Sequence, residues 1–249
     1  RQIAARFLER PESECFIGYE KAPGGTVRAA FIRAPEDVGR LVWNDECFVN
    51  LASYLARFRG KDAVVGIVLK GCDARAFREL VRSRQVSRSK VFVVGLPCDG
   101  LAGPGEDELA ERCFGCVYPE NFDYDEVLGP MTSPKLPPRP DGDLLSDLTP
   151  EERFAFWNKE LEKCIRCDAC KNTCYGCFCP ECIFDSTEPR WLSRRQGTSE
   201  KFYFHAVRAL HLAGRCIECG ECERACPTGV RLMLLNRRLS LGVEELFGS

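Results

Sequence analysis

Short apolar and polar segments alternate through the first part of the chain. The apolar runs at 15–19 and 28–33 have the length of strands. The segments 35–41 and 47–58 instead repeat their apolar residues at the spacing of a helix. The pattern therefore predicts two strands followed by two short helices.

A strand, a helix and a second strand follow. Residues 62–69 (DAVVGIVL) and 90–96 (KVFVVGL) are rich in β-branched side chains, which is typical of strands buried on both faces. Between them, 74–84 has helical spacing, and Asp73 is a candidate N-cap for that helix. Strands joined through a helix run parallel, so the sequence predicts an α/β domain with a parallel or mixed sheet.

The carboxyl-terminal part has a mainly helical pattern. Thr149 can cap a helix, Pro150 fits its first position, and Glu151 and Glu152 favour the positive end of its dipole. Gly214 ends a second periodic segment. Helices are expected at 150–163, 199–213, 231–240 and 243–246.

Between these parts lies a segment without apolar periodicity. Residues 129–147 contain five prolines and read as a linker. The sequence therefore predicts an α/β domain at 1–128 and a helical domain at 148–249, each large enough to fold alone.

Cysteine content changes this picture. The chain has 249 residues, of which 17 are cysteine and 45% are hydrophobic. A chain of this length can bury an ordinary core without disulfides, and an odd number of cysteines cannot pair completely. We therefore expect metal-binding cysteines in a reducing compartment, the cytoplasm.

Charge and hydropathy exclude two other classes. The 35 basic and 37 acidic residues give a net charge of −2, which does not favour nucleic acid as a partner. The longest apolar run, 63–69, is far shorter than the ~18 residues of a membrane-spanning helix. The first ten residues lack the apolar region of a signal peptide.

The strongest motif is a run of four cysteines, Cys216, Cys219, Cys222 and Cys226, followed by Pro227. This is the bacterial ferredoxin spacing for a [4Fe–4S] cluster. Structural zinc sites normally use two separated CxxC pairs, so the spacing favours a cluster.

The same spacing occurs earlier, at Cys164, Cys167, Cys170 and Cys174, with Tyr175 in place of the proline. In two-cluster ferredoxins the fourth cysteine of each run binds the partner cluster. The expected ligand sets are therefore Cys164, Cys167, Cys170 and Cys226 for one cluster, and Cys216, Cys219, Cys222 and Cys174 for the other. The long interval 175–215 resembles the helical two-cluster domain of heterodisulfide reductase and glycerol-3-phosphate dehydrogenase iron–sulfur subunits.

Three further cysteines follow the first run. Cys177, Cys179 and Cys182 (CFCPEC) are surplus to two cubane clusters. They could form a further metal site with a fourth ligand from elsewhere. Alternatively, one could replace Cys174 as a ligand, or they could be free thiols beside the cluster.

Four cysteines of the first domain could bind a third cluster. Cys72 and Cys98 each follow a predicted buried strand, and parallel strands place such positions at one edge of the sheet. Cys113 and Cys116 form a CxxC pair that would complete the set. In the alternative reading, Cys72 and Cys98 are ordinary buried residues. Cys15 and Cys47 lie in apolar runs and are expected in the core.

Two motifs resemble a known family. GIVLKGCDARAFREL (66–80) and VFVVGLPCDGL (91–101) are similar to the amino-terminal domain of coenzyme F420 hydrogenase/dehydrogenase beta subunits. With the dicluster domain, the resemblance covers roughly 12–130 and 150–247. It implies an iron–sulfur protein that accompanies anaerobic hydrogenase, formate dehydrogenase or heterodisulfide reductase complexes, in a family whose beta subunits carry FAD, a cluster and a deazaflavin site.

Evidence for a flavin is limited to one turn. Lys70 and Gly71 at a strand-to-helix junction could bind the phosphate of FAD, but no GxGxxG follows any predicted strand. His205 and His211 are six residues apart on one predicted helix and point about 120° apart, so they are not expected to share a site.

Three functions remain open. The first is a non-catalytic electron-transfer subunit, with two or three [4Fe–4S] clusters between a catalytic partner and an acceptor. Its partners would be catalytic and flavin-containing subunits of a redox complex. The second is a flavin-containing subunit that exchanges hydride with a nicotinamide or deazaflavin and passes single electrons to the clusters. The third is a zinc-stabilised interaction module. No catalytic acid–base residue is expected in the first.

Overall fold

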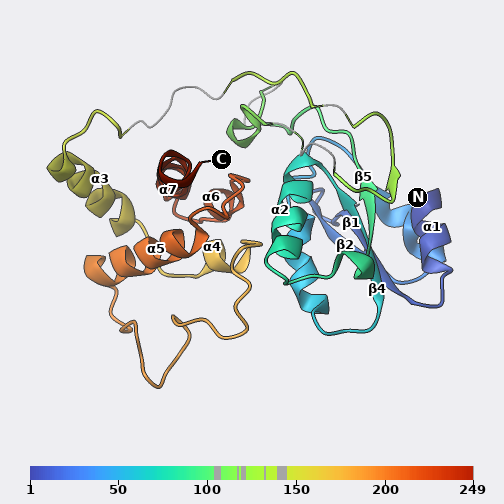
Figure 1. The fold of residues 1–249 in the computed structure, drawn as a ribbon, viewed down its shortest axis with the longest axis horizontal. Coiled ribbons are helices and arrows are strands. Elements are labelled where there is room, and N and C mark those ends of the chain that lie inside the picture. The colour runs from blue at the N-terminus through green and yellow to red at the C-terminus, as the bar shows by residue number, and fades with distance from the viewer. Residues whose placement is uncertain (104–107, 117, 119–121, 132, 139–144, 249) are drawn as a thin grey trace. The chain divides into compact units, whose positions relative to one another are not determined.

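The computed structural model describes residues 1–103, 108–116, 118, 122–131, 133–138 and 145–248. The chain forms two compact units, Arg1–Pro140 and Asp141–Ser249. Figure 1 shows a sheet with helices in the first unit and helices joined by loops in the second.

A mixed sheet forms the centre of the first unit, in the order β2-β1-β4-β5-β6, and β3 pairs with β1. Strand β1 is antiparallel to β2 and β3, whereas β4 is parallel to both β1 and β5, and β5 is parallel to β6. The predicted mixed sheet is therefore confirmed. The strands are β1 (Ser13–Lys21), β2 (Val27–Ile32), β3 (Leu41–Val42), β4 (Val64–Leu69), β5 (Val91–Gly95) and β6 (Glu126–Val127).

Helices cover this sheet on opposite sides, as Figure 1 shows for α1 (Gln2–Leu8) and α2 (Gly71–Arg82). Phe7 of α1 stacks on Phe92, with ring centroids 5.1 Å apart, and packs beside Phe16. A Cβ atom at Gly66 of β4 would lie only 2.4 Å from the Phe16 ring, so this strand position requires glycine. Helix α1 was not predicted, because it is too short for a clear periodic pattern.

Two predictions for this unit need correction. The segments with helical spacing form 3₁₀ helices, η1 (Pro35–Arg40) and η2 (Leu51–Phe58), rather than α-helices. Asp73 does not cap α2, because the helix begins earlier, at Gly71, and the Asp73 carboxylate is buried in an ion pair with Lys70. The other short 3₁₀ helices are η3 (Arg88–Lys90) and η4 (Glu111–Cys113).

Residues 145–248 of the second unit contain helices and no strand. Thr149 caps α3 as predicted, and Glu152 completes a capping box: Glu152 N donates to Thr149 Oγ1 (3.2 Å), and Thr149 N donates to Glu152 Oε2 (2.8 Å). Residues 231–246, predicted as two helices, form one, because Gly242 is tolerated inside it. The helices are α3 (Pro150–Glu162), α4 (Ala169–Asn172), α5 (Thr198–Leu212), α6 (Glu221–Arg224) and α7 (Leu232–Phe247).

The core of this unit includes cysteines. Leu161, Phe204 and Val230 pack with Cys164 and Cys222 in one buried cluster. Helix α5 packs against α3 and α7, and α4 packs against α6.

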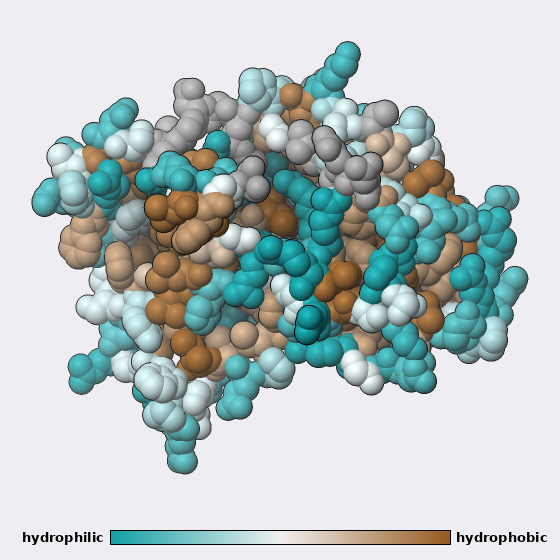
Figure 2. All heavy atoms as spheres, viewed as in Figure 1, coloured by the Kyte–Doolittle hydropathy of each residue, from teal (hydrophilic) through white to brown (hydrophobic). Residues whose placement is uncertain are grey.

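On the face of the molecule visible in Figure 2, apolar side chains lie among hydrophilic ones. No helix in the described part of the chain is long and apolar enough to cross a bilayer.

Candidate iron–sulfur sites

The two cysteine runs of the second unit have the same backbone. We call residues 164–174 the first cysteine loop and residues 216–226 the second cysteine loop. In each, the second and fourth residues after the first cysteine are left-handed: Arg166 (φ 51°) and Asp168 (φ 59°), and Glu218 (φ 55°) and Gly220 (φ 70°). A four-residue helix, α4 or α6, follows.

This backbone brings N–H groups to the cysteine sulfurs. Arg166 N donates to Cys164 Sγ at 3.3 Å, and the backbone of Glu218 bonds to Cys216 at the equivalent place. A left-handed non-glycine residue costs about 1–2 kcal/mol, and three of these four positions are not glycine. Such strain concentrates at functional sites, so the repeated geometry marks both loops.

The fourth cysteine of each loop lies near the other loop. Burial raises the pKa of Cys164, and the neighbouring Cys226 and Cys167 thiolates raise it further. Burial raises the pKa of Cys222 to about 12, with a further contribution from Cys174. Cys226 thus interacts with a thiol of the first loop and Cys174 with a thiol of the second, an arrangement compatible with the crossed ligand sets.

Side chains from α5 and α7 also reach these sulfurs. His205 Nε2 lies 3.2 Å from Cys164 Sγ, and its Nδ1 has no hydrogen-bond partner in the described part of the chain. Burial and the nearby Arg208 lower the pKa of His205 to about 4. A neutral imidazole with an unpartnered Nδ1 is suited to donate Nε2–H to the sulfur. In the second loop, Asn236 Nδ2 donates to Cys222 Sγ at 3.6 Å.

A buried arginine lies among the thiols of both loops. The Arg208 side chain is 3% exposed, and Nη2 donates to Cys170 O at 3.0 Å. Burial lowers its pKa, but the thiolates of Cys174, Cys177, Cys222 and Cys170 outweigh this and raise it. Neutral thiols would leave the positive charge of Arg208 uncompensated. The guanidinium and the surrounding cysteines therefore fit an anionic, thiolate-bound cluster.

Periodicity along α5 could have identified these residues. Its buried positions are Phe204, His205, Arg208, Ala209 and Leu212, which recur at helical spacing. The pattern places a histidine and an arginine on an otherwise apolar face, beside the cysteines. Asn236 had no comparable signal.

The described residues do not form a ready site for one metal ion. No three of their His, Cys, Asp or Glu side chains converge closely enough to hold one. A structural zinc needs four ligands around a single ion, whereas the thiolates of a cubane bind separate irons.

The four candidate ligands of the first unit lie near the carboxyl edge of β4 and β5. Cys72 lies in the first turn of α2 and Cys98 follows β5. Burial raises the pKa of Cys98 to about 12, and the thiolates of Cys72 and Cys113 also raise it. Cys116 Sγ is 4.0 Å from Arg75 Nη2 on α2. The four candidate ligands are thus gathered around the start of one helix.

Lys70 and Gly71 at this edge have internal roles. Lys70 Nζ is buried and donates to Asp73 (2.9 Å), Tyr19 OH (2.5 Å) and Val49 O (3.0 Å). A Cβ atom at Gly71 would lie 2.2 Å from the Tyr118 ring. The ammonium donors are occupied and the glycine is required for packing, so this arrangement gives no support to a phosphate or flavin role.

The remaining cysteines divide into two groups. Cys15 and Cys47 are fully buried in the first unit, which confirms their prediction as core residues. Cys177, Cys179 and Cys182 line one cavity of about 430 Å³ in the second unit. The Cys174 thiol donates a hydrogen bond to Cys177, which raises the pKa of Cys174.

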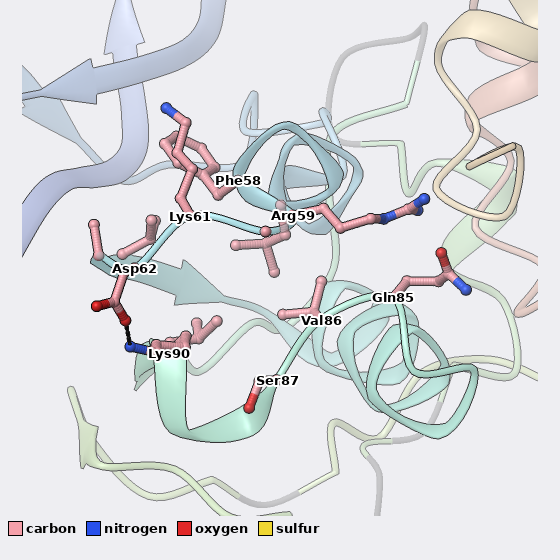
Figure 3. A pocket seen from close by; sticks show the side chains of 13 residues that line it. Phe58, Arg59, Lys61, Asp62, Gln85, Val86, Ser87 and Lys90 are labelled. Carbon is pink, nitrogen blue, oxygen red and sulfur yellow. Dashed lines mark hydrogen bonds and ion pairs between the residues drawn. The ribbon is translucent and has the colours of Figure 1, made fainter. Parts of the chain in front are cut away.

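Another pocket, of about 320 Å³, lies at the opposite edge of the sheet (Figure 3). It is lined by residues at the starts of β4 and β5, including Asp62 and Lys90, which pair at 2.5 Å. Ligands of open α/β sheets bind at the carboxyl ends of the strands. This pocket therefore does not extend the cysteine site.

Comparisons with known proteins agree with iron–sulfur binding. The 4Fe-4S binding domain family matches residues 212–231, which include the cysteines of the second loop. The chain is 32% identical over 93 residues to the F420-dependent formate dehydrogenase subunit beta of Methanocaldococcus jannaschii. It is 35% identical over 97 residues to the F420-dependent formate dehydrogenase 1 subunit beta of Methanococcus maripaludis.

These alignments are partial. They cover 37% and 39% of this chain, and 24% and 25% of the two relatives. The chain thus spans about a quarter of the length of the curated relatives it matches. What is shown is a 4Fe–4S binding segment and a local similarity to formate dehydrogenase beta subunits.

Proposed function

We propose that this chain is an iron–sulfur electron-transfer subunit of an anaerobic multisubunit oxidoreductase complex of the hydrogenase, formate dehydrogenase or heterodisulfide reductase type. The observation that carries this proposal is the repeated left-handed backbone of the two cysteine loops, with the fourth cysteine of each beside the other loop. One cluster is held by Cys164, Cys167, Cys170 and Cys226, and the other by Cys216, Cys219, Cys222 and Cys174.

The chain's own residues would hold the clusters and stabilise their negative charge. Each bound cluster would accept and release one electron. Backbone N–H groups, His205 and Asn236 donate hydrogen bonds to the ligand sulfurs, which stabilises added negative charge. Arg208 places a buried positive charge beside both loops. Burial of Cys164, Cys170 and Cys222 excludes water.

A third cluster is proposed for the first unit, held by Cys72, Cys98, Cys113 and Cys116. Its support is the gathering of these thiols at the carboxyl edge of β4 and β5. Such a cluster would lengthen the electron path between a catalytic partner and an acceptor. We assign the subunit to the cytoplasm, where free thiols such as those described here remain reduced.

The proposed partners follow from the relatives. Their names describe beta subunits of F420-dependent formate dehydrogenases, so catalytic and flavin-containing subunits of a redox complex are the expected partners. The flavoenzyme alternative rested on the family resemblance and on Lys70 and Gly71, and the structure gives these two residues internal roles. We therefore retain electron transfer as the single function.

An anaerobic redox titration followed by electron paramagnetic resonance (EPR) tests this function. Purified full-length protein should show separate one-electron reductions, and Cys219→Ser should remove one of them. Cys47→Ala is the matched control, because Cys47 is a core residue outside every proposed ligand set. Release of flavin on denaturation, or zinc without any reducible cluster, would contradict the proposal.

A further inference from the structure

The cavity beside the first cysteine loop contains three thiols that belong to no proposed cluster. Cys177, Cys179 and Cys182 all line it. Neither expected cubane ligand set of the second unit uses these thiols, so their chemistry is open.

Cys179 and Cys182 have the spacing and exposure of a reactive pair. They form a Cys-Pro-Glu-Cys sequence, the CxxC arrangement of dithiol oxidoreductases. Cys179 is exposed, whereas Cys182 is half-buried at the start of a turn in which its carbonyl accepts from Asp185 N at 2.8 Å. An exposed attacking thiol followed by a shielded second thiol suits thiol–disulfide exchange.

Cationic side chains line the same cavity. Lys171 Nζ pairs with Asp185 at 2.6 Å and interacts electrostatically with Cys182. Arg208 and Arg215 line the same cavity. These cations favour an anionic ligand in the cavity. The volume of about 430 Å³ lies in the range of small-molecule sites.

We propose that Cys179 and Cys182 form a redox-active dithiol–disulfide couple that reduces a small anionic disulfide bound in this cavity. The Cys179 thiolate attacks one substrate sulfur, which breaks the substrate S–S bond, forms a mixed disulfide and releases one thiolate. The Cys182 thiolate then attacks Cys179 Sγ and releases the second. The two released thiolates take up the two protons lost by the cysteines, so one disulfide is reduced and one is formed.

Restoring the dithiol takes two electrons and two protons. Only this step rests on the proposed electron-transfer function. Cys177 lines the same cavity and is hydrogen-bonded to Cys174, a proposed ligand of the second cluster. The couple would thus lie beside the source of those electrons.

One equivalent of the anionic disulfide DTNB, added to anaerobic full-length holoprotein, tests the couple. About two equivalents of thionitrobenzoate should be released, and peptide mapping should show a Cys179–Cys182 disulfide. Cys179→Ser and Cys182→Ser should each release about one equivalent and retain an adduct on the remaining cysteine. Cys15→Ala, a core control, should behave as the wild type.

Iron analysis of the same samples distinguishes failure of the dithiol couple from failure of the proposed electron-transfer function. Both serine variants should keep the wild-type iron content. Loss of iron from either variant, or stable adducts in the wild type, would overturn the couple and leave electron transfer intact. Protein that contains no cluster would overturn the proposed function, while the thionitrobenzoate stoichiometry would still decide the couple.

Discussion

The first and second cysteine loops have one backbone and different surroundings. Both place left-handed residues at equivalent positions, but the first has Asp168 where the second has Gly220. The first receives a contact from His205 of α5, and the second a hydrogen bond from Asn236 of α7. Spacing thus sets the shape of each loop, whereas the helix packed against it decides which side chain reaches the sulfur.

A second contrast separates these loops from the cysteines of the first unit. There, Cys72 and Cys98 come from different strand ends, and Cys113 and Cys116 from a later segment. No local backbone repeat links them. Their proximity depends on the parallel pairing of β4 with β5. The first unit therefore assembles its candidate site by topology, and the second unit by local sequence.

The largest expected effect comes from breaking the crossed ligand sets. Cys226→Ala should remove the cluster of the first loop, and Cys174→Ala that of the second, so each should lose about four irons. His205→Leu identifies the missing cluster: it should shift a potential in the Cys174→Ala background and none in Cys226→Ala. Iron analysis and EPR titration measure both. A potential shift by His205→Leu in the Cys226→Ala background would contradict the crossing.

The next largest effect concerns Arg208, the buried arginine that lies beside both loops. Arg208→Met removes the buried charge beside both, so the free energy of unfolding should fall by about 3 kcal/mol or more. Both cluster potentials should also fall, because a positive charge stabilises the reduced state. Anaerobic denaturant titration measures the stability. Arg208→Lys, which keeps the charge, should retain most of both properties; equal losses in the two variants would show that packing alone matters.

A third prediction concerns the left-handed residue four positions after the first cysteine, which is Asp168 in the first loop and Gly220 in the second. Gly220→Ala places a Cβ atom at φ 70° and should destabilise the protein by about 1 kcal/mol. Asp168→Gly, at φ 59°, should be neutral or stabilising. Thermal unfolding of the holoprotein measures both. A destabilising Asp168→Gly would mean that the carboxylate itself holds the first loop.

The smallest effect is the most specific. His205→Leu should lower only the potential of the first loop's cluster, and Asn236→Leu only that of the second. Loss of one hydrogen bond to a ligand sulfur should lower the reduction potential of the cluster by roughly tens of millivolts. His205→Gln, which keeps an N–H donor, should restore part of the shift. A change in both potentials in either single variant would contradict the separation.

Local signals in the sequence predicted much of this arrangement. The strand pattern and the N-cap at Thr149 depend on neighbours in the chain, and the structure has those elements where they were expected. Asp73 shows where local reasoning fails: its residue type fits an N-cap, but its carboxylate forms a buried ion pair with Lys70. That contact depends on packing around Tyr19, which no local pattern encodes.

The site itself was predictable only in part. The ligand cysteines could be named from spacing, and the buried face of α5 could have pointed to Arg208. Asn236 had no such signal, and both roles follow from the packing of α5 and α7 beside the loops. Lys70 is the opposite case. A strand-to-helix lysine suggests phosphate, yet three internal partners occupy its ammonium group.

Iron, acid-labile sulfide and zinc content of anaerobically purified full-length protein tests the central claim most directly. Two clusters in the second unit and one in the first predict about twelve irons and twelve sulfides per chain. Cys72→Ser should reduce both to about eight. Zinc in place of iron, without acid-labile sulfide, would contradict the iron–sulfur assignment, and a wild-type value near eight would remove the cluster of the first unit.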